Sequence, residues 1–310
     1  MSRRWIALCV LLLAFVAAAG EADLAFKDTG GGLFAFDTGA LKGTLRADGK
    51  CQGIIPLVDT RSGTSLARSV GILSYYRLFS TGKRYADGRN RPTANELLPD
   101  GAVKMHWPAD EANPFEMDAL FRWKSPTAID LETTVKPTQD LPRFEVFLSS
   151  YLAKEFRSFV YVKPARYGGG KPGFLAADVS PLLEGTYLAF PRDLAAAQIV
   201  LDGRWELGHN PVQWSITRYL GAPMAMRRDE KGDLTVLFLS RPEDCFAIET
   251  PYNMTPPDGV AGHYSTYLSL FGGDLKTGQA ARAVVRLVVD RGLTDARALA
   301  LYQQFIAETK

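Results

Sequence analysis

The sequence is poor in cysteine and histidine, which limits disulfide and metal chemistry. Of its 310 residues, three are cysteines and three are histidines. No histidine has a second histidine or a cysteine at the spacing of zinc ligands, so no metal is expected. Cys51 and Cys245 lie far apart in the chain and show no disulfide framework pattern. They form either one disulfide or two buried thiols, and the sequence leaves both open.

An excess of positive charge is also absent. Lysine and arginine total 36, against 34 for aspartate and glutamate. The N-terminal segment 1–19 holds two of the arginines and no acidic residue, so without it the two totals become equal at 34. A neutral chain with no basic cluster lacks the electrostatic character of a nucleic-acid binder. Neutral polar or sugar-like ligands remain open.

Motifs for the common cofactors are missing. The chain contains no P-loop, dinucleotide-binding fingerprint, HExxH, GxSxG or CxxC sequence. Phosphate cradles, nicotinamide binding and the serine-hydrolase elbow therefore lack their usual signals. We expect no cofactor.

Long apolar runs are confined to the N-terminus. Arg3 and Arg4 precede an apolar segment that ends in three alanines at 17–19, which is typical of a secretory signal peptide cleaved near Ala19. No later stretch approaches the roughly 18 apolar residues of a membrane helix. Cys9 lies inside the apolar segment and not at its end, which argues against a lipid anchor. The mature chain is expected to be exported, either to a periplasm or to the extracellular space, without a membrane anchor.

Strand patterns dominate the remaining chain. Residues 115–124 and 128–137 alternate apolar and polar side chains with a period of two, and similar segments recur every 10–15 residues with few helices between them. This spacing favours antiparallel sheets over βαβ units and predicts an all-β sandwich in one domain, residues 20–310. Only residues 293–310 have a clear helical pattern, with Thr294 as the N-cap. The Gly- and Pro-rich segment 166–181 is expected to be a surface loop.

Two loops and one strand end carry candidate ligand-binding side chains. Segment 82–96 concentrates basic residues, including Arg84 and Arg89, which form either a clamp for a carboxylate or diol, or a solvated loop. His209 lies in a loop near Trp214. Aromatic residues beside a polar loop residue are common at ligand sites, although turn formation explains Asn210 and Pro211 equally well.

A tyrosine-rich strand and an acidic strand end follow. His263 and Tyr264 begin the strand. Either the aromatic rings there stack on a sugar face, or His263 is only a histidine at the end of a strand. Glu249 ends the apolar run 245–248 just before Thr250 and Pro251. It is either a solvated strand end or a carboxylate directed into a cleft.

The Glu249 segment resembles the C-terminal part of the galactose mutarotase (aldose 1-epimerase) family. In that family an apolar strand ends at the catalytic glutamate, and a loop and a final strand follow; here the matching residues are 245–251, 252–262 and 275–289. The order of strands over residues 24–290 is similar too. The resemblance implies an antiparallel β-supersandwich with a C-terminal helix and a carbohydrate bound on the concave face of a sheet.

The resemblance also implies a pair of proton-transfer groups. Glu249 matches the base that takes the anomeric proton. The family's Asn-His pair has no counterpart, because the matching place reads Leu-Ser-Ser-Tyr at 148–151. Tyr151, or His209 or His263 from another loop, is the alternative acid. Arg89 loosely matches the family's arginine loop.

Three functions remain open at this point. The first is an exported carbohydrate-binding or carbohydrate-active protein, with Arg84, Arg89, Tyr151, Trp214 and Tyr264 as binding residues. The second is a sugar epimerase or polysaccharide lyase on the same fold, which predicts either a raised carboxylate pKa at Glu249 or an arginine in contact with it. The third is a binding or structural module without turnover.

Overall fold

The computed structural model describes residues 24–68, 70–153, 156–164, 170–177, 187–229, 233–251 and 264–310. The segment 1–19, interpreted above as a signal peptide, lies outside these ranges. Among the described residues, no helix is both long and apolar enough to cross a membrane.

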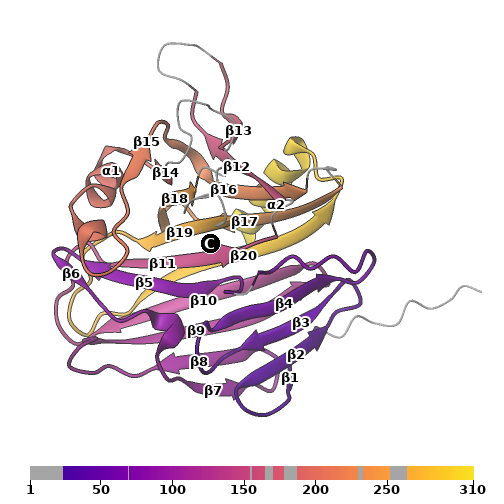
Figure 1. Ribbon diagram of the computed structural model, residues 1–310, viewed down its shortest axis with the longest axis horizontal. Coiled ribbons are helices and arrows are strands. Elements are labelled where there is room, and N and C mark those ends of the chain that lie inside the picture. Colours follow the sequence, from indigo (N-terminus) through magenta and orange to yellow (C-terminus); the bar gives the residue numbers. More distant parts are fainter. Residues whose placement is uncertain are drawn as a thin grey trace, which may run out of the picture.

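Three sheets make up the fold (Figure 1). The four-stranded sheet joins β1 (Lys27–Asp28), β2 (Leu33–Asp37), β3 (Leu41–Arg46) and β4 (Gly53–Asp59). The nine-stranded sheet has the order β13 (Gly173–Ala176), β12 (Phe156–Val162), β16 (Leu220–Asp229), β17 (Leu234–Ser240), β20 (Ala281–Arg291), β10 (Ala128–Pro137), β9 (Phe115–Ser125), β8 (Val103–Trp107) and β7 (Ala94–Leu97). The seven-stranded sheet has the order β15 (Trp214–Ile216), β14 (Tyr187–Pro191), β18 (Cys245–Pro251), β19 (Ser265–Phe271), β11 (Glu145–Tyr151), β5 (Ser74–Ser80) and β6 (Lys83–Arg84). The described strand pairs are antiparallel, apart from the parallel pair β14–β15, so the predicted all-β, antiparallel architecture is confirmed.

The main core lies between the two larger sheets. Strands β9 and β10 each bury every second residue, as their sequences predict. Their buried faces meet those of β11, β18 and β19 in one cluster that includes Phe121, Leu131, Leu148, Ile248 and Leu268. Successive side chains of a strand point to opposite faces, so the remaining side chains of both sheets lie on their outer faces. In β11, β18 and β19 these side chains are mostly buried too.

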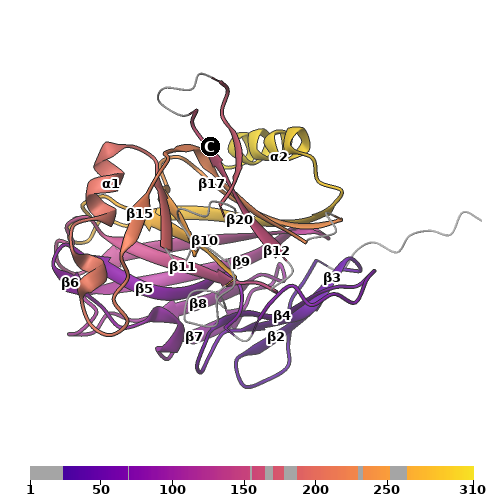
Figure 2. The same ribbon diagram turned by 45° about the horizontal axis from the view of Figure 1, so that its top comes forward.

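Both outward faces carry a second layer. The outer face of the nine-stranded sheet is covered by α2 (Asp295–Glu308), which runs near β17 and β20 (Figure 2). Thr294 caps this helix, because its side chain accepts a hydrogen bond from the Arg297 N–H. The outer face of the seven-stranded sheet is covered by α1 (Leu194–Val200) and the 3₁₀ turn η3 (Arg204–Glu206). A further 3₁₀ turn, η1 (Gly88–Asn90), lies beside β5.

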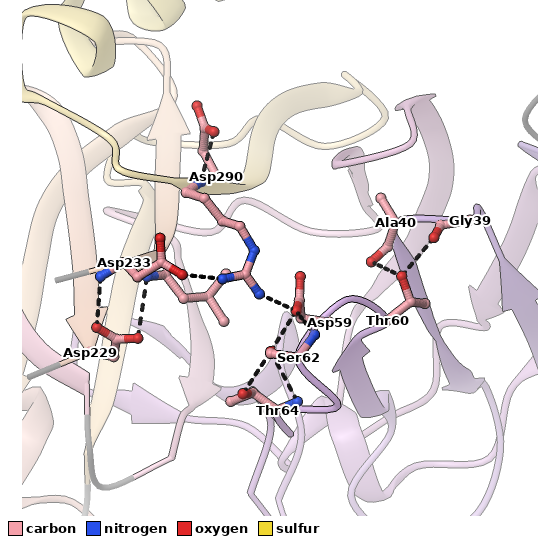
Figure 3. A network of polar contacts seen from close by, with 11 residues as sticks. Gly39, Ala40, Asp59, Thr60, Ser62, Thr64, Asp229, Asp233 and Asp290 are labelled. Carbon is pink, nitrogen blue, oxygen red and sulfur yellow. Dashed lines mark hydrogen bonds and ion pairs between the residues drawn. The ribbon is translucent and has the colours of Figure 1, made fainter. Parts of the chain in front are cut away.

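An ion-pair network ties the four-stranded sheet to the main sandwich (Figure 3). Arg291, at the end of β20, donates to Asp59 at the end of β4 and to Asp233. Asp59 also accepts hydrogen bonds from the backbone N–H (2.7 Å) and the hydroxyl of Ser62. Burial raises the pKa of Asp59, but the Ser62 bonds and Arg291 outweigh it and hold the pKa below its ordinary value. The network therefore contains an ionised aspartate at neutral pH.

Two local expectations need correction. Helix α1 was not predicted, because its seven residues are too few to show a helical period; Asp193 nevertheless caps it by accepting from the Ala196 N–H. Segment 166–181 is not loop throughout, since Gly173–Ala176 forms β13 at the edge of the nine-stranded sheet. Cys51 and Cys245 are both free thiols.

Candidate functional site

A cavity of about 630 Å³ lies on the outer face of the seven-stranded sheet. The chain from η3 to β15 forms its other wall, which is the segment that leaves α1 in Figure 2. The described lining residues are mostly aromatic: Arg68, Val70, Tyr76, Arg77, Phe147, Tyr151, Tyr187, Trp205, Asn210, Pro211, Val212, Trp214 and Tyr267. Its size and lining are typical of a small-molecule site.

A β-bulge in β5 directs two neighbouring residues to this cavity. Arg77 pairs with Phe147 and Tyr75 pairs with Leu148, so Tyr76 has no partner on β11. Tyr75 belongs to the main core, whereas Tyr76 and Arg77 both line the cavity. Strict alternation would send Tyr76 and Arg77 to opposite faces; the extra residue of the bulge removes that restriction.

The aromatic rings support one another. Phe147 stacks on Tyr267 with ring centroids 4.5 Å apart, and Trp205 meets Phe147 edge-on at the same distance. The ring centroid of Trp214 lies 5.1 Å from that of Trp205 and 5.6 Å from that of Tyr187. The indole N–H groups of Trp205 and Trp214 are buried and have no hydrogen-bond acceptor in the described part of the chain. Unsatisfied buried donors are uncommon in folded proteins and call for an explanation.

Arg77 is a second source of unsatisfied donors. It is 2% exposed, and its Nη2 donates to the Asn210 carbonyl (2.9 Å) and the Tyr76 hydroxyl (3.2 Å). Its Nε and Nη1 groups have no hydrogen-bond partner among the residues that the structure describes. The guanidinium carbon lies 4.8 Å from the Tyr76 ring centroid and 5.2 Å from that of Trp205, so aromatic faces stabilise part of the charge.

Tyr151 and Arg89 form the edge of the cavity. The Arg89 guanidinium lies 3.9 Å from the Tyr76 ring centroid and hydrogen-bonds to Tyr151. The Tyr267 hydroxyl donates to that of Tyr151 at 3.4 Å. Burial raises the pKa of Tyr151, although the Tyr267 bond and the Arg89 charge oppose this. Burial and the neighbouring Tyr151 raise the pKa of Tyr267 well above its ordinary value. Both phenols are therefore protonated at neutral pH and act as hydrogen-bond donors or acids, not as bases.

A chain of polar groups lies in the sheet on the same side. Glu249 on β18 stands directly opposite Tyr267 on β19, so the two side chains share the outer face. The Ser269 hydroxyl lies 2.8 Å from Glu249 Oε1 and 2.7 Å from Glu145 Oε1. Glu145 also accepts from Arg204 Nη1 at 2.8 Å, in an ion pair that is almost fully buried.

The contacts of Ser269 with Glu249 and Glu145 require one of the two carboxyl groups to be protonated. The Ser269 hydroxyl has one proton and can serve only one of the two carboxyl oxygens, so the other contact needs a proton of its own. Burial raises the pKa of both acids, and Glu145 raises that of Glu249 further, to well above its ordinary value. Because Arg204 stabilises the anion of Glu145, we assign the proton to Glu249. Glu249 Oε2 is buried and has no hydrogen-bond partner.

The structure brings together some of the predicted site residues. Tyr151 and Trp214 line the cavity, and Arg89 lies against two of its lining residues. Glu249 is 1% exposed and is not among the described lining residues, although its neighbour Tyr267 is. Tyr264 lies under the guanidinium of the lining residue Arg68, 5.4 Å away.

The other predicted residues lie elsewhere. Arg84 donates to the carbonyls of Leu207 (3.2 Å) and His209 (2.8 Å) and pairs with Asp87, so it anchors the loop after η3. His209 is exposed and lines a separate hollow with Arg84 and Asn90. His263 lies outside the described residues. The catalytic and binding roles assigned to these residues stay predictions.

Several site residues were not singled out in the sequence. Arg77 and Tyr76 lie in the strand SYYRLFS, where a charged residue between aromatic and apolar ones was an available signal. The sequence contains no comparable signal for Tyr187, Glu145, Ser269 and Arg204, since single polar residues in strands or turns are common. Their grouping depends on strands far apart in sequence.

No protein-family model matches the chain. No curated protein matches it either. Solved structures with a similar course of the chain include an aldose epimerase homologue from Caenorhabditis elegans (9% identity; 87% of this chain and 99% of that chain; TM-score 0.48). A galactose 1-epimerase from Lactobacillus acidophilus is similar as well (8% identity; 88% of this chain and 99% of that chain; TM-score 0.44). A third is a heparan sulfate lyase mutant from Pedobacter heparinus (7% identity; 88% of this chain and 37% of that chain; TM-score 0.44). This chain therefore spans little more than a third of that lyase. Aldose epimerases are therefore among the solved structures that are similar to this chain.

Proposed function

We propose that this protein binds carbohydrate in the cavity on the outer face of the seven-stranded sheet. The observation that carries the proposal is the combination of aromatic walls with buried donors that have no partner, above all the indole N–H of Trp214. Aromatic faces stack on the apolar faces of sugar rings, and N–H groups donate to sugar hydroxyls. A bound sugar would satisfy both.

The cavity also offers donors and acids at its edge. The protonated hydroxyl of Tyr151 can donate to a ring oxygen or hydroxyl, with Arg89 holding it in place. Glu249, by contrast, carries a proton and lies behind the described lining. It acts as a base only if it first passes this proton on, and Ser269 and Glu145 provide the nearest route.

A second candidate function is enzymatic. An epimerase or lyase on this fold predicts either a raised carboxylate pKa at Glu249 or an arginine beside it. The pKa of Glu249 is raised, which favours this candidate, whereas the nearby Arg204 pairs with Glu145. In this version Glu249 is the base, with Tyr151, His209 or His263 as the acid.

Fluorescence titration tests the binding proposal. Trp205 and Trp214 line the cavity and are the natural reporters, so neutral and uronic sugars are expected to change their emission in a saturable way. Trp214→Phe keeps a ring and removes the N–H, and we expect about tenfold weaker binding. Trp123→Phe is the matched control, because the Trp123 indole N–H is also buried without a partner but lies in the main core. Equal loss in both variants, or no saturable response, would reject the proposal.

Turnover is measured in the same samples. Anomer interconversion reports a mutarotase, and an unsaturated sugar product reports a lyase. Glu249→Gln should abolish either activity and leave sugar affinity within a few-fold. Saturable binding with neither product assigns the protein to the class of non-catalytic modules.

Export is part of the same proposal. The order of charged, apolar and small residues over 1–19 supports removal of this segment and release to a periplasm or the extracellular space. The mass of the protein recovered from an expressing culture tests it. A mature chain that still begins at Met1 and remains inside the cell would reject export.

A further inference from the structure

The cavity contains a buried positive charge that the described protein does not balance. Arg77 is 2% exposed. Among the described residues it donates to a carbonyl and a phenol, and two of its three guanidinium nitrogens have no hydrogen-bond partner. A buried guanidinium without an anion is unfavourable unless other groups replace its hydration. The two aromatic faces beside it offset only part of this.

The other buried arginines show what the fold does elsewhere. Arg204 pairs with Glu145 and Asp202, Arg286 with Asp130 and Glu308, and Arg91 with Asp110. Arg227 uses all three of its guanidinium nitrogens in hydrogen bonds. Arg77 alone among these five has neither a carboxylate nor a full set of acceptors within the described residues.

No other described residue that lines the cavity compensates for this charge. Of the described lining residues, the charged ones are Arg68 and Arg77, both positive. Arg89 adds a third guanidinium behind Tyr76 and Tyr151. The nearby acids offer little, because Glu145 already pairs with Arg204 and Glu249 holds a proton by the geometry of Ser269.

We infer that the cavity takes an acidic carbohydrate, whose carboxylate or sulfate group pairs with Arg77. This inference rests on the proposed function, and it narrows the substrate class from sugars in general to anionic ones. The aromatic walls hold the sugar rings while the anion supplies the acceptors that Nε and Nη1 lack. Guanidinium groups suit both anions, because they offer several N–H donors in one plane.

Pairs of sugars that differ only in charge test the inference. The probes are galactose against galacturonate, glucose against glucuronate, and galactose against galactose 6-sulfate. We expect each acidic sugar to bind at least tenfold more tightly than its neutral partner at low salt, and the advantage to shrink as salt is added. The carboxylate and sulfate arms show which anion is preferred.

Arg77→Gln should remove this advantage, because it lowers the affinity for each acidic sugar at least tenfold more than the affinity for its neutral partner. The matched control is Arg282→Gln, which removes one positive charge from an exposed pair with Glu132 outside the cavity. It should leave the advantage intact. Thermal unfolding checks that both variants are folded. Competition between inorganic sulfate and galacturonate for the wild-type protein tests the anion site without any variant.

The outcomes separate this inference from the proposed function. Equal affinity for acidic and neutral sugars, unchanged in Arg77→Gln, overturns the inference and leaves sugar binding standing. Stabilisation of the wild type by sulfate, lost in Arg77→Gln, with no response to any sugar, supports the anion site and overturns sugar binding. Absence of any response overturns both.

Discussion

The two outer faces of the sandwich are built alike but differ in how their buried charges are paired. Each face is a sheet covered by a helix, and each buries an arginine. Under α2, Arg286 pairs with Asp130 and Glu308. Next to α1, Arg204 pairs with Glu145 and Asp202, but Arg77, on the same face, has no carboxylate within the described residues. Paired charges fasten the layers together, whereas the charge beside the cavity, unpaired within the described residues, is the basis of the proposed anionic-sugar site.

The largest expected effect concerns Arg204. Arg204→Met leaves Glu145 and Asp202 without their cation, so we expect a loss of about 3–5 kcal/mol in the free energy of unfolding. Urea unfolding measures it. Arg282→Met, which breaks only an exposed pair, should lose less than about 1 kcal/mol. A loss in Arg204→Met no greater than in this control would show that the buried pair does not stabilise the α1 face.

The equivalent change on the other face should have a smaller effect. Arg286→Met removes the partner of Asp130 and Glu308, which are partly exposed and can be rehydrated. We expect a loss of about 2 kcal/mol in the same urea experiment. A loss equal to that of Arg204→Met would remove the distinction between the two faces.

Glu249 makes the stability of the α1 face depend on pH. The folded protein holds the Glu249 proton, whereas the unfolded chain releases it above about pH 4.3, so stability from this group is complete below that pH and falls as pH rises. Its part of the slope is at most about 1.4 kcal/mol per pH unit. Glu249→Gln, which cannot ionise, should lose stability less steeply between pH 5 and 8.

Glu249→Gln is not expected to remove the whole pH dependence of stability, because a second buried acid contributes to it. Glu145 shifts in the same direction and keeps part of the slope in the variant. Urea unfolding at several pH values compares the two proteins. Parallel curves for the wild type and the variant would mean that Glu249 is ionised in the folded state.

The smallest effect is expected for Arg77. Arg77→Met leaves no carboxylate unpaired within the described residues, and the loss of two hydrogen bonds is offset by removal of a buried charge. The change should be about 1 kcal/mol or less, of either sign. Destabilisation of 3 kcal/mol or more would make Arg77 a structural group like Arg204.

The sequence predicted the fold better than the site. Alternation in β9 and β10 and the Thr294 cap of α2 depend on neighbouring residues, so they were visible in the chain and are confirmed. The position of Arg77 depends on a bulge against β11, and that of Glu249 on contact with Ser269 twenty residues away. Such pairings form only when distant strands meet, and no local pattern shows them.

The ion pair between Arg291 and Asp59 places a constraint on the timing of folding. It joins residues separated by 232 positions, and its arginine belongs to the last strand of the chain. The four-stranded sheet is made first during synthesis and contacts early residues of the sandwich, for example through Phe26 and Trp123, but Asp59 gains this partner only when β20 has emerged. A chain stopped before β20 would therefore lack this fastening at Asp59, and the resistance of the four-stranded sheet to proteolysis should rise once residue 291 is present.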